Sequence, residues 1–89
     1  MPRRTLDIVN KLGLHARAAA QFVKVAGAYG ANVSVEKDGQ CVDGKSIMAV
    51  MMLAAAKGAR ITVETEGADA DAALEAIAEL VADRFGEDV

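Results

Sequence analysis

The chain has 89 residues, which is the size of one small domain, and it carries a formal net charge of −3. Aromatic residues make up only 3% of it and no basic cluster is present, so nucleic-acid binding is not expected. One cysteine excludes an internal disulfide, and the longest apolar run, 47–56, is too short to span a membrane. We therefore predict one domain over residues 1–89, located in the cytoplasm and not inserted in a membrane.

The spacing of apolar residues predicts four strands and three helices in the order βαββαβα. The expected strands are 5–9, 32–36, 41–42 and 60–66. The expected helices are 16–28, 47–56 and a last one that begins near Asp69 and carries Phe85 on its apolar face. This order favours an α+β fold with an antiparallel sheet covered by helices on one face. The last residues, 86–89, are predicted to fray.

The single histidine, His15, follows a turn with a glycine and precedes a run of alanines. Because alanine is the best helix former, a helix is predicted to begin at Ala16, with His15 at its N-cap or just before it. The unpaired amides and the dipole of a helix N-terminus attract anions such as phosphate, and Arg17 adds a positive charge. Together, His15, the amides at the helix start and Arg17 predict a site for a phosphoryl group. His15 could equally be a simple cap, and Arg17 a solvated side chain.

The second helix, 47–56, is apolar all round, although a small domain cannot bury a helix on every side. The residues expected in the core are Val50, Leu53 and Ala54. The residues expected to form an exposed patch beside His15 are Ile47, Met48 and Met51. Exposed apolar patches mark protein interfaces, and flexible methionines let such a surface adapt to several partners. Met52 could face either way.

The chain closely resembles the HPr family in two motifs, Gly13-Leu14-His15-Ala16-Arg17 and Gly44-Lys45-Ser46-Ile47-Met48. Its length and its predicted order of strands and helices are also similar to those of the family. The members of the family are the histidine phosphocarrier proteins of the bacterial phosphoenolpyruvate-dependent phosphotransferase system. The resemblance covers essentially the whole chain. It implies an open-faced β-sandwich, with a four-stranded antiparallel sheet of order 1-4-2-3 under three helices. It also implies a carrier rather than an enzyme, in which His15 accepts a phosphoryl group on Nδ1 from Enzyme I and passes it to a IIA-type protein.

The same resemblance implies roles for further residues. Arg17 would steady the phosphate, and the backbone amides of Ala16 and Arg17 would bind it. Ser46 would be a regulatory site for an HPr kinase/phosphorylase, although serine at a helix start also serves as an N-cap. The docking surface implied for Enzyme I and IIA-type proteins consists of Ala16, Ala20, Lys24, Ile47, Met48 and Met51.

Ala18 stands where most sequences of the family have proline, which points to the nitrogen-related branch of the system rather than the sugar-transport branch. Cys41 is expected to be half-buried in a strand, and the acidic residues from 69 to 88 are interpreted as a solvated helix face. We predict no metal, no cofactor and a monomer. Two other classes stay open: a regulatory module that acts by docking, with His15 incidental, and a small-ligand-binding domain.

Overall fold

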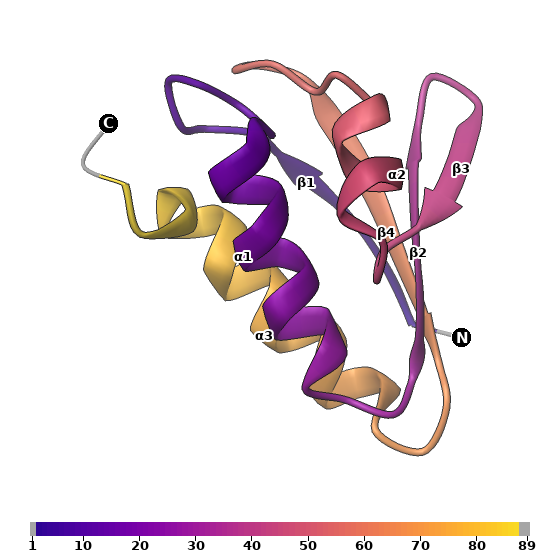
Figure 1. Ribbon diagram of the computed structural model, residues 1–89. Helices are drawn as coiled ribbons and strands as arrows, with labels where there is room; N and C mark the ends of the chain where they lie inside the picture. The colour runs from indigo at the N-terminus through magenta and orange to yellow at the C-terminus, as the bar shows by residue number, and fades with distance from the viewer. Residues whose placement is uncertain (1, 88–89) are drawn as a thin grey trace.

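The computed structural model describes residues 2–87, in which three helices cover one face of a four-stranded antiparallel sheet (Figure 1). The strands are β1 (Arg3–Asp7), β2 (Asn32–Lys37), β3 (Gln40–Asp43) and β4 (Arg60–Glu66), in the sheet order β1-β4-β2-β3. The helices are α1 (Ala16–Gly27), α2 (Ile47–Met52) and α3 (Ala70–Ala82), and a short 3-10 turn η1 (Arg84–Gly86) follows α3. The predicted fold class, element order and strand order are confirmed.

The core lies between the inner face of the sheet and the helices. Alternate residues of the central strands point inward, and Val35 of β2 pairs with Val63 of β4; both are fully buried. Phe22 of α1 and Ile77 of α3 are also fully buried in the same cluster. Figure 1 shows α1 and α3 side by side across the sheet, with α2 beside α1 near β3. This packing places the N-terminus of α1 at the edge of the core.

The first strand is displaced from its predicted position, since it covers Arg3–Asp7 rather than 5–9. Ile8 is buried, but its amide donates to the carbonyl of Ala59 at 2.9 Å and its carbonyl accepts from Gly58 N at 2.8 Å. Val9 is exposed. The chain therefore leaves the sheet at Ile8 and enters the loop that leads to His15.

The second helix is shorter than predicted because it ends at Met52 rather than near residue 56. Ala54 has a φ of 51°, and its amide bonds to Met51 O at 3.0 Å, so a tight turn closes the helix. Val50 and Leu53 are buried as predicted, but Ala54 is exposed and its core assignment is wrong. The turn instead buries Ala55, whose carbonyl supports the loop before His15.

The predictions for the C-terminal part and for Cys41 also need correction. Phe85 is buried, but it lies in η1 with a φ of 55° rather than on the apolar face of α3. Gly86 belongs to η1 and Glu87 is half-buried, so these two residues are not frayed; residues 88–89 lie outside the described part of the chain. Cys41 is exposed on β3, opposite Glu36, because it points to the outer face of the sheet.

Candidate functional site

His15 is the N-cap residue of α1, as predicted. Its backbone is extended, with φ −74° and ψ 179°, and its Nδ1 accepts a hydrogen bond from the amide of Arg17 at 3.3 Å. The His15 carbonyl accepts from Ala19 N at 2.8 Å, which is the first bond of the helix. The side chain is 28% exposed. One ring nitrogen thus faces the amides that begin α1, where an anion is stabilised by unpaired donors and the helix dipole.

The loop before His15 is held by backbone contacts to the segment after α2. Leu14 is buried, and its amide donates to the Ala55 carbonyl at 2.8 Å. Gly13 has a φ of +66°, and a Cβ built on it would lie 2.4 Å from the same carbonyl oxygen. Only glycine satisfies both the left-handed backbone and this close approach. The position of His15 therefore depends on Gly13.

Glu87 is the partner of the other ring nitrogen. Its Oε2 forms a hydrogen bond with Nε2 of His15, and its Oε1 accepts from Nδ2 of Asn10 at 2.8 Å. These hydrogen bonds from Asn10 and His15, with a smaller contribution from the charge of Arg17, hold the pKa of the Glu87 carboxyl below its ordinary value. The site therefore favours the ionised, carboxylate form of Glu87.

The sequence interpretation missed Glu87, because it placed the residue in a frayed end and treated the nearby acidic residues as a solvated face. Asp69 also departs from that interpretation, since its carboxylate accepts from the amides of Gly30 and Ala31 at 2.9 Å and 2.8 Å. Glu87 lies 72 positions from His15. No local spacing pattern links residues so far apart, and only the path of η1 brings them together.

Arg17 lies exposed in the first turn of α1. Its side chain lines a hollow of about 630 Å³ together with Leu12, Phe85 and Glu87, so the guanidinium and the carboxylate share one surface beside His15. A guanidinium provides a planar, permanently charged group that matches phosphate oxygens. Arg17 therefore lies on the surface beside His15, and its contact with phosphate stays a prediction. Ala18 is fully buried, and the branch inferred from it stays a prediction.

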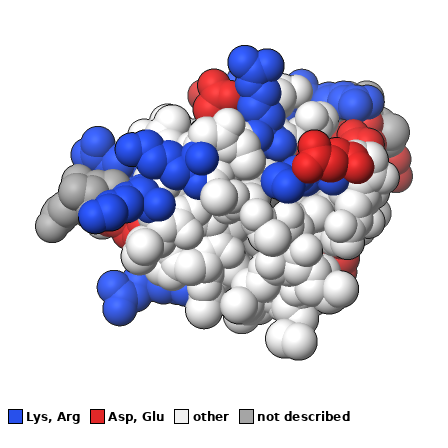
Figure 2. Space-filling model, turned by 90° about the horizontal axis from the view of Figure 1, so that it is seen from above, with Lys and Arg blue, Asp and Glu red and all other residues white. Residues whose placement is uncertain are grey.

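Ser46 is the N-cap of α2, and its Oγ accepts from the amide of Ala49 at 3.3 Å. The helix exposes a group of large apolar side chains that we call the α2 patch. Its members are Ile47, Met48 and Met51, which are 43%, 73% and 38% exposed. Met52 is exposed as well. Figure 2 shows a broad uncharged surface with Lys and Arg gathered along part of its margin. The predicted exposure of the patch is confirmed, and its use in docking stays a prediction.

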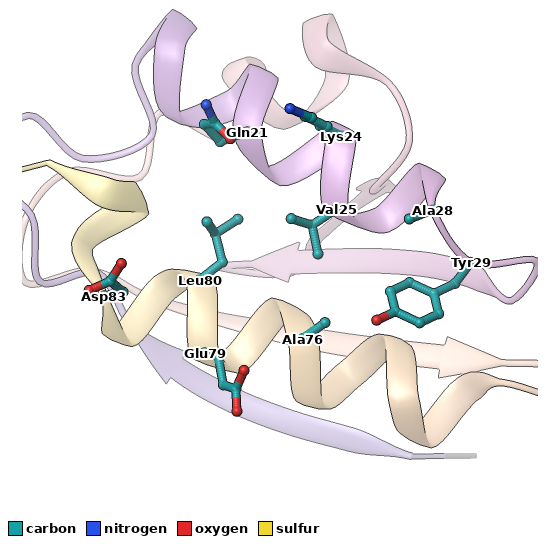
Figure 3. Close-up of a pocket in the computed structure, with 9 residues that line it drawn as sticks. All are labelled: Gln21, Lys24, Val25, Ala28, Tyr29, Ala76, Glu79, Leu80 and Asp83. Atoms are coloured by element: carbon teal, nitrogen blue, oxygen red, sulfur yellow. The ribbon is translucent and has the colours of Figure 1, made fainter.

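A second hollow, of about 670 Å³, lies between α1 and α3 (Figure 3). Val25 and Leu80 point into it, and Tyr29 lies at one end. Lys24, which the sequence assigned to docking, lines this groove from α1, whereas Ala16 and Ala20 are exposed elsewhere on the helix. His15 and Arg17 are not among the residues around it. The groove adjoins the hollow beside His15, because Gln21, Leu80 and Asp83 line both.

Within residues 2–87, no group of three or more His, Cys, Asp or Glu side chains is arranged to hold a metal ion. Over the same part of the chain, no helix is long and apolar enough to cross a membrane. On the Nδ1 side of His15, the groups that could bind a ligand are the ring nitrogen, the amides that begin α1 and the side chain of Arg17, while the Glu87 carboxylate bonds to Nε2. This set is suited to an anion.

Comparisons with known proteins agree on the class of protein that this fold and site define. Residues 2–83 match the family model described as "PTS HPr component phosphorylation site". The chain is 58% identical to the phosphocarrier protein HPr of Pseudomonas aeruginosa over 98% of both chains, and 49% identical to that of Cupriavidus necator, also over 98% of both. The crystal structure of HPr-C-His from Thermoanaerobacter tengcongensis superposes with a TM-score of 0.96 over 100% of both chains, at 40% identity.

These matches define a phosphocarrier, a protein that holds a phosphoryl group rather than catalysing a reaction of its own. The chain belongs to the HPr family of the phosphotransferase system.

Proposed function

We propose that this protein accepts a phosphoryl group on Nδ1 of His15 from Enzyme I, and that it passes the group to a IIA-type protein in the cytoplasm. The observation that carries the proposal is the placement of His15 as the N-cap of α1, with Nδ1 at 3.3 Å from the Arg17 amide. A phosphoryl group on Nδ1 would meet the same amide through its oxygens. The family membership supports this assignment, because its members are phosphocarriers.

The transfer itself requires one nucleophile and one set of anion-binding groups. The lone pair of Nδ1 attacks phosphorus, the Nδ1–P bond forms, and the bond between phosphorus and the donor breaks with its electron pair returning to the donor. The Arg17 amide exchanges the ring nitrogen for a phosphoryl oxygen, and the dipole of α1 stabilises the added negative charge. Passing the group onward is the same step in reverse with another acceptor.

Replacing Arg17 by lysine is expected to slow phosphoryl transfer and to leave the fold intact. Lysine keeps the charge but lacks the planar fork that can bind two phosphate oxygens at once. Because Arg17 is exposed, the substitution should change the free energy of unfolding by less than about 0.5 kcal/mol. Rapid-quench kinetics with phospho-Enzyme I measures the effect. Transfer at the wild-type rate would remove Arg17 from the site.

Docking on Enzyme I and IIA-type proteins is proposed to use the α2 patch together with Ala16, Ala20 and Lys24. The patch consists of exposed apolar side chains on a helix that packs beside α1. When a partner covers large apolar groups that were exposed to water, the free energy of the complex is lowered. The charged margin visible in Figure 2 would give orientation to a transient complex. A transient complex of this kind needs only a small interface, which a monomer of this size can provide.

Met48→Lys is expected to weaken binding to Enzyme I by roughly tenfold or more, since it places a charge within the buried part of the complex. Titration calorimetry or NMR shift mapping measures the change. Cys41→Lys is the matched control, because it adds the same charge to an exposed position on the outer face of the sheet. Equal effects of the two substitutions would show that charge, and not the α2 patch, controls binding.

The direct test of the carrier function is incubation of the protein with phosphoenolpyruvate and Enzyme I. The expected product has gained one phosphate that is acid-labile and alkali-stable, as a phosphorylated imidazole is, and gives it up when a IIA-type protein is added. A protein that acts only as a docking module, or as a sensor of a small ligand, gains none. Mass spectrometry before and after acid treatment separates these cases.

We also propose that Ser46 is a regulatory phosphorylation site in organisms with an HPr kinase/phosphorylase. Ser46 is half-buried at the start of α2 and lies directly before Ile47 of the α2 patch. A phosphate there would be stabilised by the helix dipole, yet it would add up to about two negative charges beside the patch. ATP and the kinase should label the wild type and not Ser46→Ala. Equal labelling of both proteins would dismiss the site.

A further inference from the structure

The contacts on the two sides of the His15 ring require the same position of its proton. Glu87 is held as a carboxylate, which has no proton to donate, so the hydrogen bond to Nε2 requires a proton on Nε2. On the other side, the Arg17 amide donates to Nδ1, so Nδ1 must present its lone pair. In a neutral imidazole only one nitrogen carries the proton. Both partners therefore select the tautomer in which Nδ1 is the free nucleophile.

Asn10 fixes the carboxylate that makes this selection. The Asn10 side chain is fully buried, and its Nδ2 donates to Gly13 O at 2.9 Å and to Oε1 of Glu87 at 2.8 Å. Its Oδ1 is buried with no partner among the described residues. Turning the amide over would direct Oδ1 at two acceptors, so the observed orientation is the one that fits. Oε1 is thereby committed to Asn10, and Oε2 is left for His15.

We propose that Glu87, held by Asn10, is a positioning residue that keeps the proton of neutral His15 on Nε2. The proposal rests on the proposed carrier function and adds a role in it for the segment after α3. As the Nδ1–P bond forms and the bond to the donor breaks, the ring becomes positively charged and its Nε2 proton stays in place. That proton then faces the Glu87 carboxylate, which stabilises the developing charge. No proton has to leave the ring during transfer.

Glu87→Gln provides a sharp test, because Asn10 determines which end of the new amide faces the ring. The Asn10 Nδ2 donor would hold the amide oxygen in the place of Oε1, which turns the amide NH₂ group toward Nε2 of His15. This group donates a hydrogen bond and so favours the tautomer with the proton on Nδ1. The substitution therefore reverses the preference rather than merely removing a contact. Glu79→Gln, at an exposed position of α3, is the control for the loss of one negative charge.

The readout is ¹⁵N NMR of the unphosphorylated protein labelled at histidine, at a pH of about 9 where an imidazole is neutral. We expect the proton on Nε2 in the wild type and in Glu79→Gln, and a shift to Nδ1 in Glu87→Gln. Phosphorylation of Glu87→Gln by phospho-Enzyme I should be roughly tenfold slower or more, since a histidine in the wrong tautomer loses its reactivity.

A wild-type ring protonated at Nδ1, an unchanged tautomer in Glu87→Gln, or a shifted tautomer with an unchanged rate would each overturn the proposal. These outcomes are distinct from failure of the carrier function. If the wild type took up no phosphate at all, the proposed function would be refuted, while the NMR measurement would still decide whether Glu87 sets the tautomer.

Discussion

Replacing His15 by alanine is expected to abolish phosphate uptake from phosphoenolpyruvate and Enzyme I. The sequence contains one histidine, so no other imidazole can replace the nucleophile. The substitution also removes the acceptor for the Arg17 amide at the start of α1, and loss of an N-cap costs about 1 kcal/mol of folding free energy. Radiolabelled phosphate transfer measures the first effect, and denaturation by urea measures the second.

His15→Asn separates these two effects. Asparagine is among the best N-cap residues, so this variant should keep the hydrogen bond to the start of α1 and unfold close to the wild-type denaturant concentration. It has no nucleophilic nitrogen, and its phosphate uptake should be abolished as completely as in His15→Ala. Acid-labile labelling retained in either variant would refute the assignment of His15.

Gly13→Ala is expected to have the largest effect on stability among single substitutions near the site. A Cβ at this position would lie 2.4 Å from the Ala55 carbonyl oxygen and 2.8 Å from the Ala56 Cα, both of them backbone atoms that cannot easily move. It would also break the Leu14 to Ala55 hydrogen bond and add the cost of a left-handed alanine. We expect a loss of about 3 kcal/mol in the free energy of unfolding, together with slower phosphate uptake.

Gly39→Ala is the matched control for this prediction. Gly39 also has a positive φ, +84°, but a Cβ there meets nothing within 4 Å. Its free energy of unfolding should fall only by the cost of the left-handed backbone, about 1 kcal/mol, and the variant should be phosphorylated at the wild-type rate. Urea denaturation of both variants measures the difference. Equal losses would mean that the contact between the His15 loop and the segment after α2 is not what holds the loop.

The parts of the fold that were predicted correctly are set by local sequence. The alternation of Arg60–Glu66 defined β4 to the residue, and the turn between β2 and β3 is made by the adjacent residues Asp38 and Gly39, which both have positive φ. The helix start after His15 follows from the alanine run, and Ser46 supplies the cap of α2. In each case the determining residues are neighbours in the chain, so their spacing carries the information.

The errors arise where tertiary contacts override local propensity. The second helix was predicted to continue to residue 56, yet the chain turns at Ala54, and the Ala55 carbonyl beyond the turn accepts the Leu14 amide. The role of Glu87 depends on buried Asn10 and on the path of η1, neither of which has a local signature. Of the candidate site, the sequence therefore predicted that His15 caps α1 with Arg17 beside it, but not the carboxylate that faces the same ring.

The most direct test of the account locates the phosphate on the protein atom by atom. The wild type, labelled with ¹⁵N at histidine, would be phosphorylated with phosphoenolpyruvate and Enzyme I and examined for nitrogen–phosphorus coupling by NMR. The arrangement of Arg17 on one side of the ring and Glu87 on the other predicts coupling to Nδ1 of His15. Phosphorus bonded to Nε2, or to any residue other than His15, would contradict it.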